Sequence, residues 1–599
     1  MIKKRKFLSL VVCLMIVGLI ASLISGCGGG GNGGNGGDGD GDGDDTPQYG
    51  GEFTVQVAAD PTYFDDAIGA HYSTTATQET LFSGDWAKGN AGGYGTGEAE
   101  WTTVINRLSV NKGYLAESYE VGDDYIIFDL RDGVKWHDKP PCNGREVTAD
   151  DVVFSIERQM TLDTAYLKKS YPHVVAAMSV TKVDEDTVRI DCDAAQMSEL
   201  LTLIDFMYIY PQDAVEEYGD MNGWQRCIGT GAFTLEDYVS GSSLTYEKNP
   251  DWWETNPVGP GEGDPLPYVD GYTVLIQPDF ATQDSLFRTG QVDMHYCDTV
   301  RARALLQDLP DVEYKTYLES ANGRVIFMRM DKEDKPWADV RVRQAMQLAI
   351  DNQKLVDELY DGDGELLYWP SWPTAEYAGS YVPLEDLDDD MIELGTEPEP
   401  TEISVADLFG YNLELAQELM DAAGYPDGFQ AEIIVYNYQF DLDSIQAVVS
   451  MLEDIGVELT LKPMDYASWT VRWVYGNYDD MFYGSWSGVA TYFKGINWSG
   501  PSMFNVSNVD DPVLNDYRDQ MLAVYPDEEA ADEIHAEMMP YLLEQCYAIQ
   551  TCQALFYRLW WPWVKNYSGE GGIGYYKALN SDRYGYIWID QDLKESMGY

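Results

Sequence analysis

The chain has 599 residues, of which 45% are hydrophobic and 13% aromatic, so it exceeds the size at which one core stops growing and should form at least two lobes. A formal net charge of −64 argues against nucleic-acid binding, because neutralising phosphates requires a basic surface. The acidity would suit cationic ligands, but the weightier interpretation is a dispersed acidic surface that keeps the protein soluble.

Residues 1–48 have the pattern of export and tethering sequence. Basic residues precede an apolar run from Phe7 to Ile24, the layout of an export signal, with a retained membrane anchor as the alternative. Ile-Ser-Gly-Cys at 24–27 resembles the bacterial lipobox, so we expect a lipoprotein signal peptide over residues 1–26 and lipidation of Cys27. Residues 27–48, rich in Gly, Asn and Asp, are too poor in apolar side chains to pack and predict a flexible tether.

In the first half of the remaining chain, side chains alternate over 125–130 and predict a strand, with further short strands after it. Thr148 precedes Ala149 and two aspartates in a capping-box-like pattern, with the Asp151 carboxylate in the first turn of a helix. Strands and helices of this kind predict a mixed α/β lobe.

The second half shows helices that stop at glycines. Asp339 can cap a helix, and the apolar stripe predicted for it is Ala345, Leu348, Ala349 and Leu355. Apolar residues recur at helical spacing over 413–423 and stop at Gly424, and the same pattern over 445–455 stops at Gly456. Alternation over 457–461 then predicts a strand, so this half also indicates an α/β layer.

The sequence shows no local catalytic or metal-binding motif. Trp486 stands where a nucleophile elbow needs its serine, no phosphate-binding loop follows a strand, and the five histidines are too far apart for a local metal face. We therefore predict no catalytic residue, no metal and no cofactor. The 102 acidic residues supply many candidate carboxylate pairs, so a secreted hydrolase stays an alternative.

Cysteines are sparse and form no Cys-x-x-Cys pair, so zinc-site spacing is absent. Export permits disulfides, but the sequence does not choose among the pairings of the six cysteines outside the signal and lipobox. These are Cys142, Cys192, Cys227, Cys297, Cys546 and Cys552.

Four segments carry a family resemblance. The first runs from Leu-Ala-Glu-Ser-Tyr at 115–119 through Phe-Asp-Leu-Arg-Asp-Gly-Val-Lys-Trp-His-Asp at 128–138 to Val-Thr-Ala-Asp-Asp-Val-Val-Phe-Ser at 147–155. The others are Gly-Thr-Gly-Ala-Phe at 229–233 with Lys-Asn-Pro-Asp-Trp-Trp at 248–253, residues 339–351, and residues 416–429. In this order, and after a lipobox, they resemble the peptide/nickel-type, or family 5, extracellular solute-binding proteins. The resemblance covers roughly Tyr49 to the C-terminus.

The resemblance implies an α/β, two-lobed periplasmic-binding-protein-like fold of type II, with an extra inserted subdomain in the first lobe. We expect lobe I at residues 49–73, 195–309 and 560–599, the inserted subdomain at 74–194, and lobe II at 310–559. The lobes would close around the ligand by a hinge motion.

The implied function is that of a substrate-binding lipoprotein of an ABC transporter. It would capture a small polar solute, oligopeptide-like or an oligosaccharide, and deliver it to a membrane permease. It would act as a monomer without enzyme activity, lipid-anchored at the extracytoplasmic face of the membrane or in the periplasm. A lipoprotein that senses a ligand and signals through a membrane partner is the other alternative.

Aromatic residues crowd the stretch from 469 to 486, and flat side chains with polar edges suit a cleft for a polar ligand, although core packing is the competing interpretation. With the pocket position that the family implies, the predicted ligand-binding residues are Trp469, Tyr483, Ser485 and Trp486, facing His71 and Tyr72.

One departure from the family bears on the ligand. Peptide binders of the family anchor the peptide's amino group with an Asp and its carboxylate with an Arg, and alignment on Trp486 places Val489 and Tyr483 at these positions. Neither side chain can form an ion pair. Unless other residues replace these anchors, this favours an uncharged ligand that stacks on aromatic rings.

Overall fold

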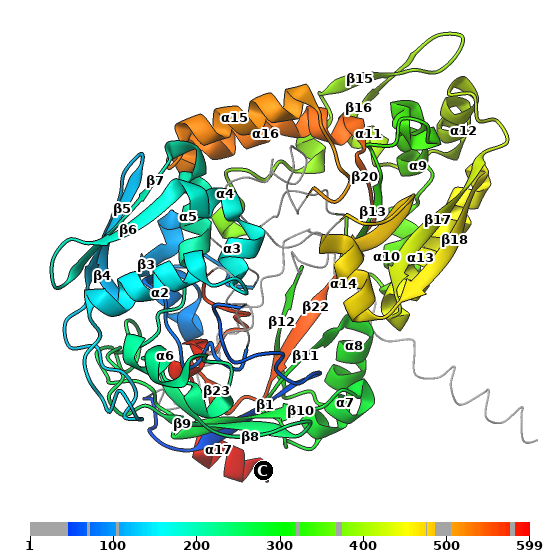
Figure 1. Ribbon diagram of the computed structural model, residues 1–599. Helices are drawn as coiled ribbons and strands as arrows, with labels where there is room; N and C mark the ends of the chain where they lie inside the picture. Colours follow the sequence, from blue (N-terminus) through cyan, green and yellow to red (C-terminus); the bar gives the residue numbers. More distant parts are fainter. Residues whose placement is uncertain are drawn as a thin grey trace, which may run out of the picture. The chain divides into compact units, whose positions relative to one another are not determined.

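Four sheets organise the residues that the computed structural model describes, which are 46–68, 72–102, 107–318, 324–366, 374–474, 476–485, 505–574 and 582–599 (Figure 1). Shorter paired segments complete them: β2 (Phe82–Gly84) with β3 (Asn111–Gly113), β14 (Gly364–Glu365) with β21 (Gln553–Ala554), β15 (Met391–Leu394) with β16 (Thr401–Ser404), and β23 (Val564–Lys565) with β24 (Trp588–Ile589).

The first sheet has the order β1-β10-β9-β8 and joins the start of the described chain to residues far along it. Its strands are β1 (Glu52–Val57), β8 (Phe233–Val239), β9 (Ser243–Lys248) and β10 (Gly271–Ile276). β1 runs parallel to β10, and the other pairs are antiparallel. The rings of Phe53, Tyr272 and Tyr246 stack in sequence across three strands, so aromatic contacts stabilise the register.

The second sheet, β4-β5-β7-β6, is antiparallel throughout and has its own hydrophobic core, separate from the core shared by the other sheets. Its strands are β4 (Ala116–Val121), β5 (Tyr125–Leu130), β6 (Met178–Lys182) and β7 (Thr187–Cys192). Helices α2 (Ala149–Thr161), α3 (Tyr166–Ser170), α4 (Pro172–Ala177), α5 (Met197–Ile204) and α6 (Gln212–Tyr218) accompany it.

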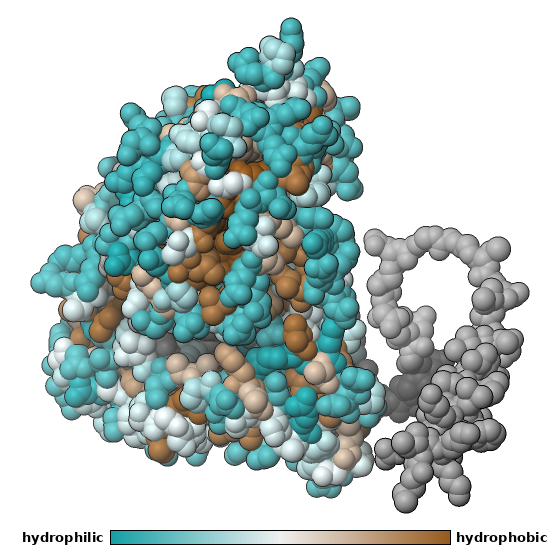
Figure 2. Space-filling model, turned by 90° about the vertical axis from the view of Figure 1, so that its right-hand side faces the viewer, coloured by the Kyte–Doolittle hydropathy of each residue, from teal (hydrophilic) through white to brown (hydrophobic). Residues whose placement is uncertain are grey.

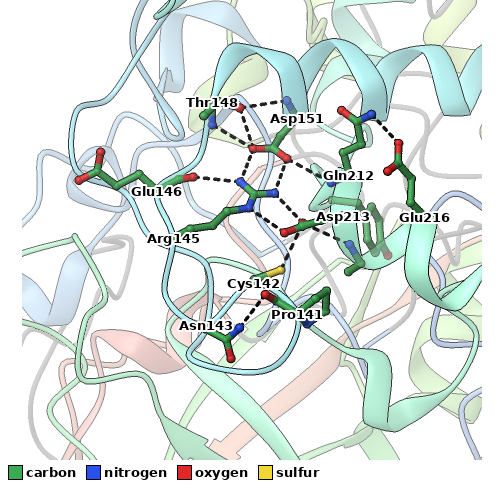
Figure 3. Close-up of polar contacts among 12 residues, drawn as sticks. Pro141, Cys142, Asn143, Arg145, Glu146, Thr148, Asp151, Gln212, Asp213 and Glu216 are labelled. Carbon is green, nitrogen blue, oxygen red and sulfur yellow. Dashed lines mark hydrogen bonds and ion pairs between the residues drawn. The ribbon is translucent and has the colours of Figure 1, made fainter.

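The capping box predicted at Thr148 is confirmed and is part of a larger polar group. The Thr148 hydroxyl accepts from Asp151 N–H, and the Asp151 carboxylate accepts from Thr148 N–H at 3.1 Å. Figure 3 shows the Arg145 guanidinium between Asp151 and Asp213, with paired hydrogen bonds to each. Hydrogen bonding from Arg145 lowers the pKa of Asp213, so the group stays ionised and fixes α2 against α6.

The third sheet has the order β18-β17-β19-β13-β20. Its strands are β13 (Arg324–Met328), β17 (Phe429–Tyr436), β18 (Val457–Met464), β19 (Met481–Ser485) and β20 (Ala548–Gln550). The helices of this part are α9 (Val340–Leu348), α10 (Asn352–Leu359), α11 (Val405–Leu408), α12 (Leu413–Ala422), α13 (Gln439–Leu452), α14 (Tyr466–Val474), α15 (Pro512–Val524) and α16 (Glu528–Gln545).

The helix stops predicted in this part are confirmed, with one correction. Gly424 and Gly456 have φ values of 89° and 77°, a backbone conformation that favours glycine, and β18 starts directly after Gly456. The helix that Asp339 caps is shorter than predicted. It ends at Leu348, and Leu355 lies on a second helix because the Asp351 side chain accepts from Lys354 N–H and begins a new first turn.

A three-stranded linking sheet joins the first sheet to the third, with the order β11-β22-β12. Its strands are β11 (Met294–Asp298), β12 (Glu313–Tyr317) and β22 (Phe556–Trp560), and α7 (Phe280–Arg288) and α8 (Thr299–Asp308) pack against it. The last helix of the chain is α17 (Gln591–Ser596). The chain leaves the first sheet through β11 and β12 and returns to it after β22. This path is consistent with two lobes, but the predicted lobe boundaries stay predictions.

Three further observations concern the cysteines, metal-binding groups and helices of the described residues. All six cysteines outside the signal and lipobox are free and buried. No group of three or more His, Cys, Asp or Glu side chains is arranged there to hold a metal ion. None of the helices in the described ranges has the length and apolar character needed to cross a membrane.

His137 joins the second sheet's body to the Gly-Thr-Gly segment that precedes β8. Its Nε2 donates to Gly231 O at 3.1 Å, and its Nδ1 accepts from Gly229 N–H at 3.3 Å, which requires a neutral imidazole. The side chain is 1% exposed, and burial lowers the pKa of His137 to about 4. Two of the segments that carry the family resemblance therefore meet at one buried histidine.

We expect this junction to weaken in mild acid. Unfolded His137 takes up a proton near pH 6.5, whereas the folded residue does so only near pH 4, so the unfolded chain binds protons first as pH falls. The contribution of neutral His137 to the free energy of unfolding is fully present above about pH 6.5. Between pH 6.5 and pH 4 it falls by up to about 3 kcal/mol. His137→Gln keeps a donor and an acceptor but cannot titrate, so thermal unfolding from pH 8 to 4 should depend less on pH.

His173→Gln is the control for the loss of a surface histidine, because the His173 side chain is 52% exposed and contacts Glu199. Any change in its pH profile should be smaller than that of His137→Gln, since a surface ion pair contributes at most about 1 kcal/mol. Identical pH profiles for His137→Gln and the unaltered protein would contradict the assignment of the acid sensitivity to His137.

Candidate ligand-binding site

One face of the linking sheet carries aromatic and basic side chains. Arg558 on the central strand pairs with Tyr296 on one side and with Lys315 on the other, and Phe556 pairs with Tyr317. Because alternate residues of a strand share a face, these five side chains lie on the same side of the sheet. The Arg558 guanidinium lies 5.4 Å from the ring centroid of Tyr296 and 4.8 Å from that of Tyr317, within cation–π range of both rings.

From this face an aromatic row continues into the body of the third sheet. Tyr296 stacks on Phe556 with centroids 5.6 Å apart, and Phe440 at the start of α13 lies 6.0 Å from Phe556. Tyr438 lies 6.1 Å from Phe440, and Tyr436 at the end of β17 lies 5.8 Å from Tyr438. We call the following set the aromatic row: Tyr317, Tyr296, Phe556, Phe440, Tyr438 and Tyr436.

The row combines accessible rings with polar edges. Tyr296 is 37% exposed, and Phe440, Tyr438 and Tyr436 are half-buried. The Tyr438 hydroxyl donates to Asp298 Oδ2 at 3.3 Å, and burial, with a smaller effect of the Asp298 charge, raises the pKa of Tyr438, so the hydroxyl stays protonated. Rings with polar edges can stack on the flat or CH-rich faces of a ligand and hydrogen-bond its polar groups.

Two predicted site residues come together beside the row but are mostly buried. The Trp469 indole donates to Tyr483 O at 3.2 Å, and its ring lies 6.0 Å from Tyr436. Tyr483 is 1% exposed, and its hydroxyl lies 2.8 Å from Ser444 Oγ in the packing between β19 and α13. Their direct contact with a ligand stays a prediction. In this structure Trp469 packs against Tyr436 of the row, and Tyr483 lies in the packing between β19 and α13.

Tyr72 lies in a separate polar group, where its hydroxyl donates to Ala59 O at 2.7 Å. Burial, and next the charge of Asp60, raises the pKa of Tyr72. His71, Trp486, Val489 and the side chain of Ser485 lie outside the described residues.

None of the members of the aromatic row was predicted from the sequence. Its members come from β11, β12, β17, α13, β22 and the turn between β17 and α13, and the predicted aromatic cluster began only at residue 469. The available signal was the alternation within 556–560, where Phe, Arg and Trp occupy one face. Unless the pairing of β22 with β11 is known, this alternation does not show which side chains lie beside these residues.

Figure 2 views the molecule from the side that carries α7, α8 and α14 in Figure 1. Apolar residues gather in the middle of this face, and hydrophilic residues cover most of the part above them. An apolar band of this kind, rimmed by polar residues, is typical of an interaction or ligand-binding region.

Comparison with known proteins agrees with this architecture. Heme-binding protein A of Haemophilus influenzae is 29% identical to this chain in the region that matches. That region covers 53% of this chain and 54% of the relative, so the match spans about half of that protein's length. Di/tripeptide-binding protein 1 of Pseudomonas aeruginosa is 26% identical over 65% of this chain and 71% of its own.

Solved structures share the fold. The periplasmic binding protein DppA of Helicobacter pylori, in complex with the peptide STSA, matches with a TM-score of 0.66 at 18% identity, over 91% of this chain and 99% of that chain. The oligopeptide-binding protein AppA of Bacillus subtilis, in complex with a nonapeptide, matches with a TM-score of 0.64 at 18% identity, over 91% and 100%. The predicted α/β, two-lobed fold of type II is thereby confirmed.

The family described as bacterial extracellular solute-binding proteins, family 5 Middle, matches residues 112–499, which is more than half of the chain. The chain therefore belongs to the family 5 extracellular solute-binding proteins.

Proposed function

We propose that the protein is the extracytoplasmic substrate-binding component of an ABC importer. It captures a small polar solute on the aromatic row and delivers it to a membrane permease. The observation that carries the proposal is the row itself, which runs from the linking sheet into the body of the third sheet. Only a ligand that contacts both the linking sheet and the body of the third sheet favours the closed arrangement over the open one. The row has members in both of these parts and so offers such contacts.

The ligand class is proposed as oligopeptide-like or oligosaccharide. The names of relatives include binding proteins for heme, di- and tripeptides, and glutathione, so the family's site accommodates diverse chemistry. Stacking on the row favours a solute with flat or CH-rich faces. Arg558, which lies over Tyr296 and Tyr317, places a basic group on this face, whereas the sequence predicted uncharged residues, Val489 and Tyr483, at the two anchor positions of the family's peptide binders.

Lipid anchoring through Cys27 at the extracytoplasmic face, with the described unit acting as a monomer, completes the proposal. Members of this family are binding proteins, which favours this function over the secreted hydrolase. A sensing lipoprotein would use the same ligand site and would differ only in its membrane partner.

A thermal-shift screen tests the proposal with dipeptides, tripeptides, glutathione and oligosaccharides as probes. A true ligand at about 100 times its dissociation constant stabilises the folded protein by about 2.7 kcal/mol. We expect one class to raise the unfolding temperature and Tyr296→Ala to remove most of that rise, because Tyr296 is the most exposed ring of the row.

Tyr314→Ala is the matched control. Tyr314 is a 53% exposed tyrosine of β12 that, by strand alternation, lies on the opposite face of the linking sheet from Tyr317. It should keep the full ligand-induced shift. Equal losses in the two variants would count against the row as the binding face, and a panel in which no probe shifts the protein would count against the proposed ligand classes.

A further inference from the structure

Two cationic side chains lie directly opposite each other on the linking sheet. Arg558 of β22 pairs with Lys315 of β12 in the antiparallel register, and the two strands lie side by side in Figure 1. Both side chains therefore leave the same face of the sheet. Residues paired in this way have Cβ atoms about 5 Å apart, and like charges at these positions destabilise a sheet. A local arrangement that costs stability is typical of a functional site.

The carboxylates beside Lys315 are weak partners for it. Lys315 Nζ lies 3.5 Å from Glu100 Oε2, which is longer than a charge-assisted hydrogen bond, and the Glu100 side chain is 36% exposed. The Lys315 charge acts to lower the pKa of Glu570, but burial has the larger effect and raises the pKa of Glu570. Burial thereby disfavours the ionised form of Glu570 that would balance a cation.

Strand alternation places the carboxylates of Asp298 and Glu313 on the same face, and both are bound to other groups. Asp298 accepts from Arg301 N–H at 3.1 Å and from the Tyr438 hydroxyl at 3.3 Å. Glu313 accepts from the Trp560 indole at 2.9 Å, and burial raises the pKa of Glu313. These hydrogen bonds fix the two carboxylates to groups other than the two cations.

Neighbouring groups orient the Arg558 guanidinium, which lies within cation–π range of two tyrosine rings of the aromatic row. A glycine-rich segment passes beside both cations. A Cβ at Gly571 would lie 2.5 Å from Arg558 Nη2 and 2.7 Å from Thr102 O, and a Cβ at Gly569 would lie 2.6 Å from Lys315 Cβ. The cations nevertheless keep access to solvent, because Arg558 is half-buried and the Lys315 side chain is 31% exposed.

An oxyanion fits this arrangement. The planar guanidinium of Arg558 presents parallel N–H groups that match the two oxygens of a carboxylate, and the Lys315 ammonium adds a point charge. A carboxylate bound by both would replace their mutual repulsion with two attractions. The rings of the aromatic row would then contact the flat or CH-rich part of the same molecule.

We propose that Arg558 and Lys315 form an anion subsite, which binds a carboxylate of the captured solute at the Tyr317 end of the aromatic row. That the bound molecule is a solute rests on the proposed function, whereas the preference of the two cations for a carboxylate does not. The subsite narrows the proposed ligand classes to peptides with a free carboxylate and to acidic saccharides. It differs from the uncharged ligand that Val489 and Tyr483 favour.

Probe pairs that differ only in one charge test the subsite. Calorimetry at low and high salt compares trialanine with its C-terminal amide, and benzoate with benzamide. We expect the carboxylate of each pair to bind at least about tenfold more tightly at low salt, because its hydrogen bonds are charge-assisted. High salt should reduce the preference. Arg558→Gln and Lys315→Gln should each remove most of it, and the partly exposed Lys315 makes its variant the safer one for folding.

Lys248→Gln is the matched control, because it removes the same charge from the first sheet, where Lys248 pairs with Asp270. It should keep the preference. Equal affinities within both probe pairs, or no binding of either carboxylate, would overturn the subsite. A preference that survives in the folded Arg558→Gln and Lys315→Gln proteins would also overturn it. A preference for benzoate with no binding of any peptide or saccharide would support the subsite and count against the proposed ligand classes.

Discussion

Replacing Asp293 with alanine should lower the free energy of unfolding by about 3 kcal/mol. Asp293 is 2% exposed, and its carboxylate accepts from Thr54 N–H at 2.7 Å, from the Trp563 indole at 2.7 Å and from Lys594 Nζ at 2.8 Å. One side chain thereby ties β1, the segment before β23 and α17 together. Its removal leaves the buried Trp563 indole N–H and the part-buried Thr54 N–H without this acceptor, and Lys594 without its partner.

Thermal and urea unfolding of Asp293→Ala would measure this loss. Asp270→Ala is the control, because Asp270 pairs with Lys248 at the surface, where an ion pair contributes at most about 1 kcal/mol. Losses of equal size in the two variants would show that the carboxylate of Asp293 does not organise the C-terminal segment.

Replacing Cys27 with alanine should abolish membrane attachment. The prediction rests on the lipobox resemblance at 24–27 and on the tether that follows it, and Cys27 lies outside the described residues. A lipid chain contributes about 0.8 kcal/mol per buried methylene, so losing it should shift the protein from the membrane to the soluble fraction, or leave an unprocessed precursor.

Membrane fractionation and intact-mass measurement distinguish these outcomes. Cys13→Ala, within the apolar run of the predicted signal, should leave attachment and the mature mass unchanged. An unmodified mature N-terminus at a residue other than Cys27 would refute the anchor, without affecting the ligand site.

Local signals predict elements well where a cap and a periodic stripe coincide. The box at Thr148 and the stop at Gly456 both act through neighbours within a few residues, so the sequence contains all the information they need. The helix at Asp339 was predicted too long because its apolar stripe continues across Asp351, whose side chain begins a second helix.

The candidate site was less predictable because it depends on distant pairing. Tyr296 and Arg558 meet only through the register of two strands about 260 residues apart, and no local pattern encodes that register. The aromatic cluster at 469–486 was predicted, but Tyr483 is buried against α13, where its hydroxyl lies beside Ser444, and sequence spacing does not reveal this packing. His71 and Trp486 stay predictions.

The linking sheet also bears on how the chain folds during synthesis. Its central strand β22 is made last, yet β11 and β12 each pair with it on opposite sides. Until residue 560 has emerged, both outer strands expose unpaired edges, which can associate with other chains. Long-range pairing of this kind also slows folding. A protein destined for export can use that delay, because the nascent chain stays unfolded long enough to be translocated.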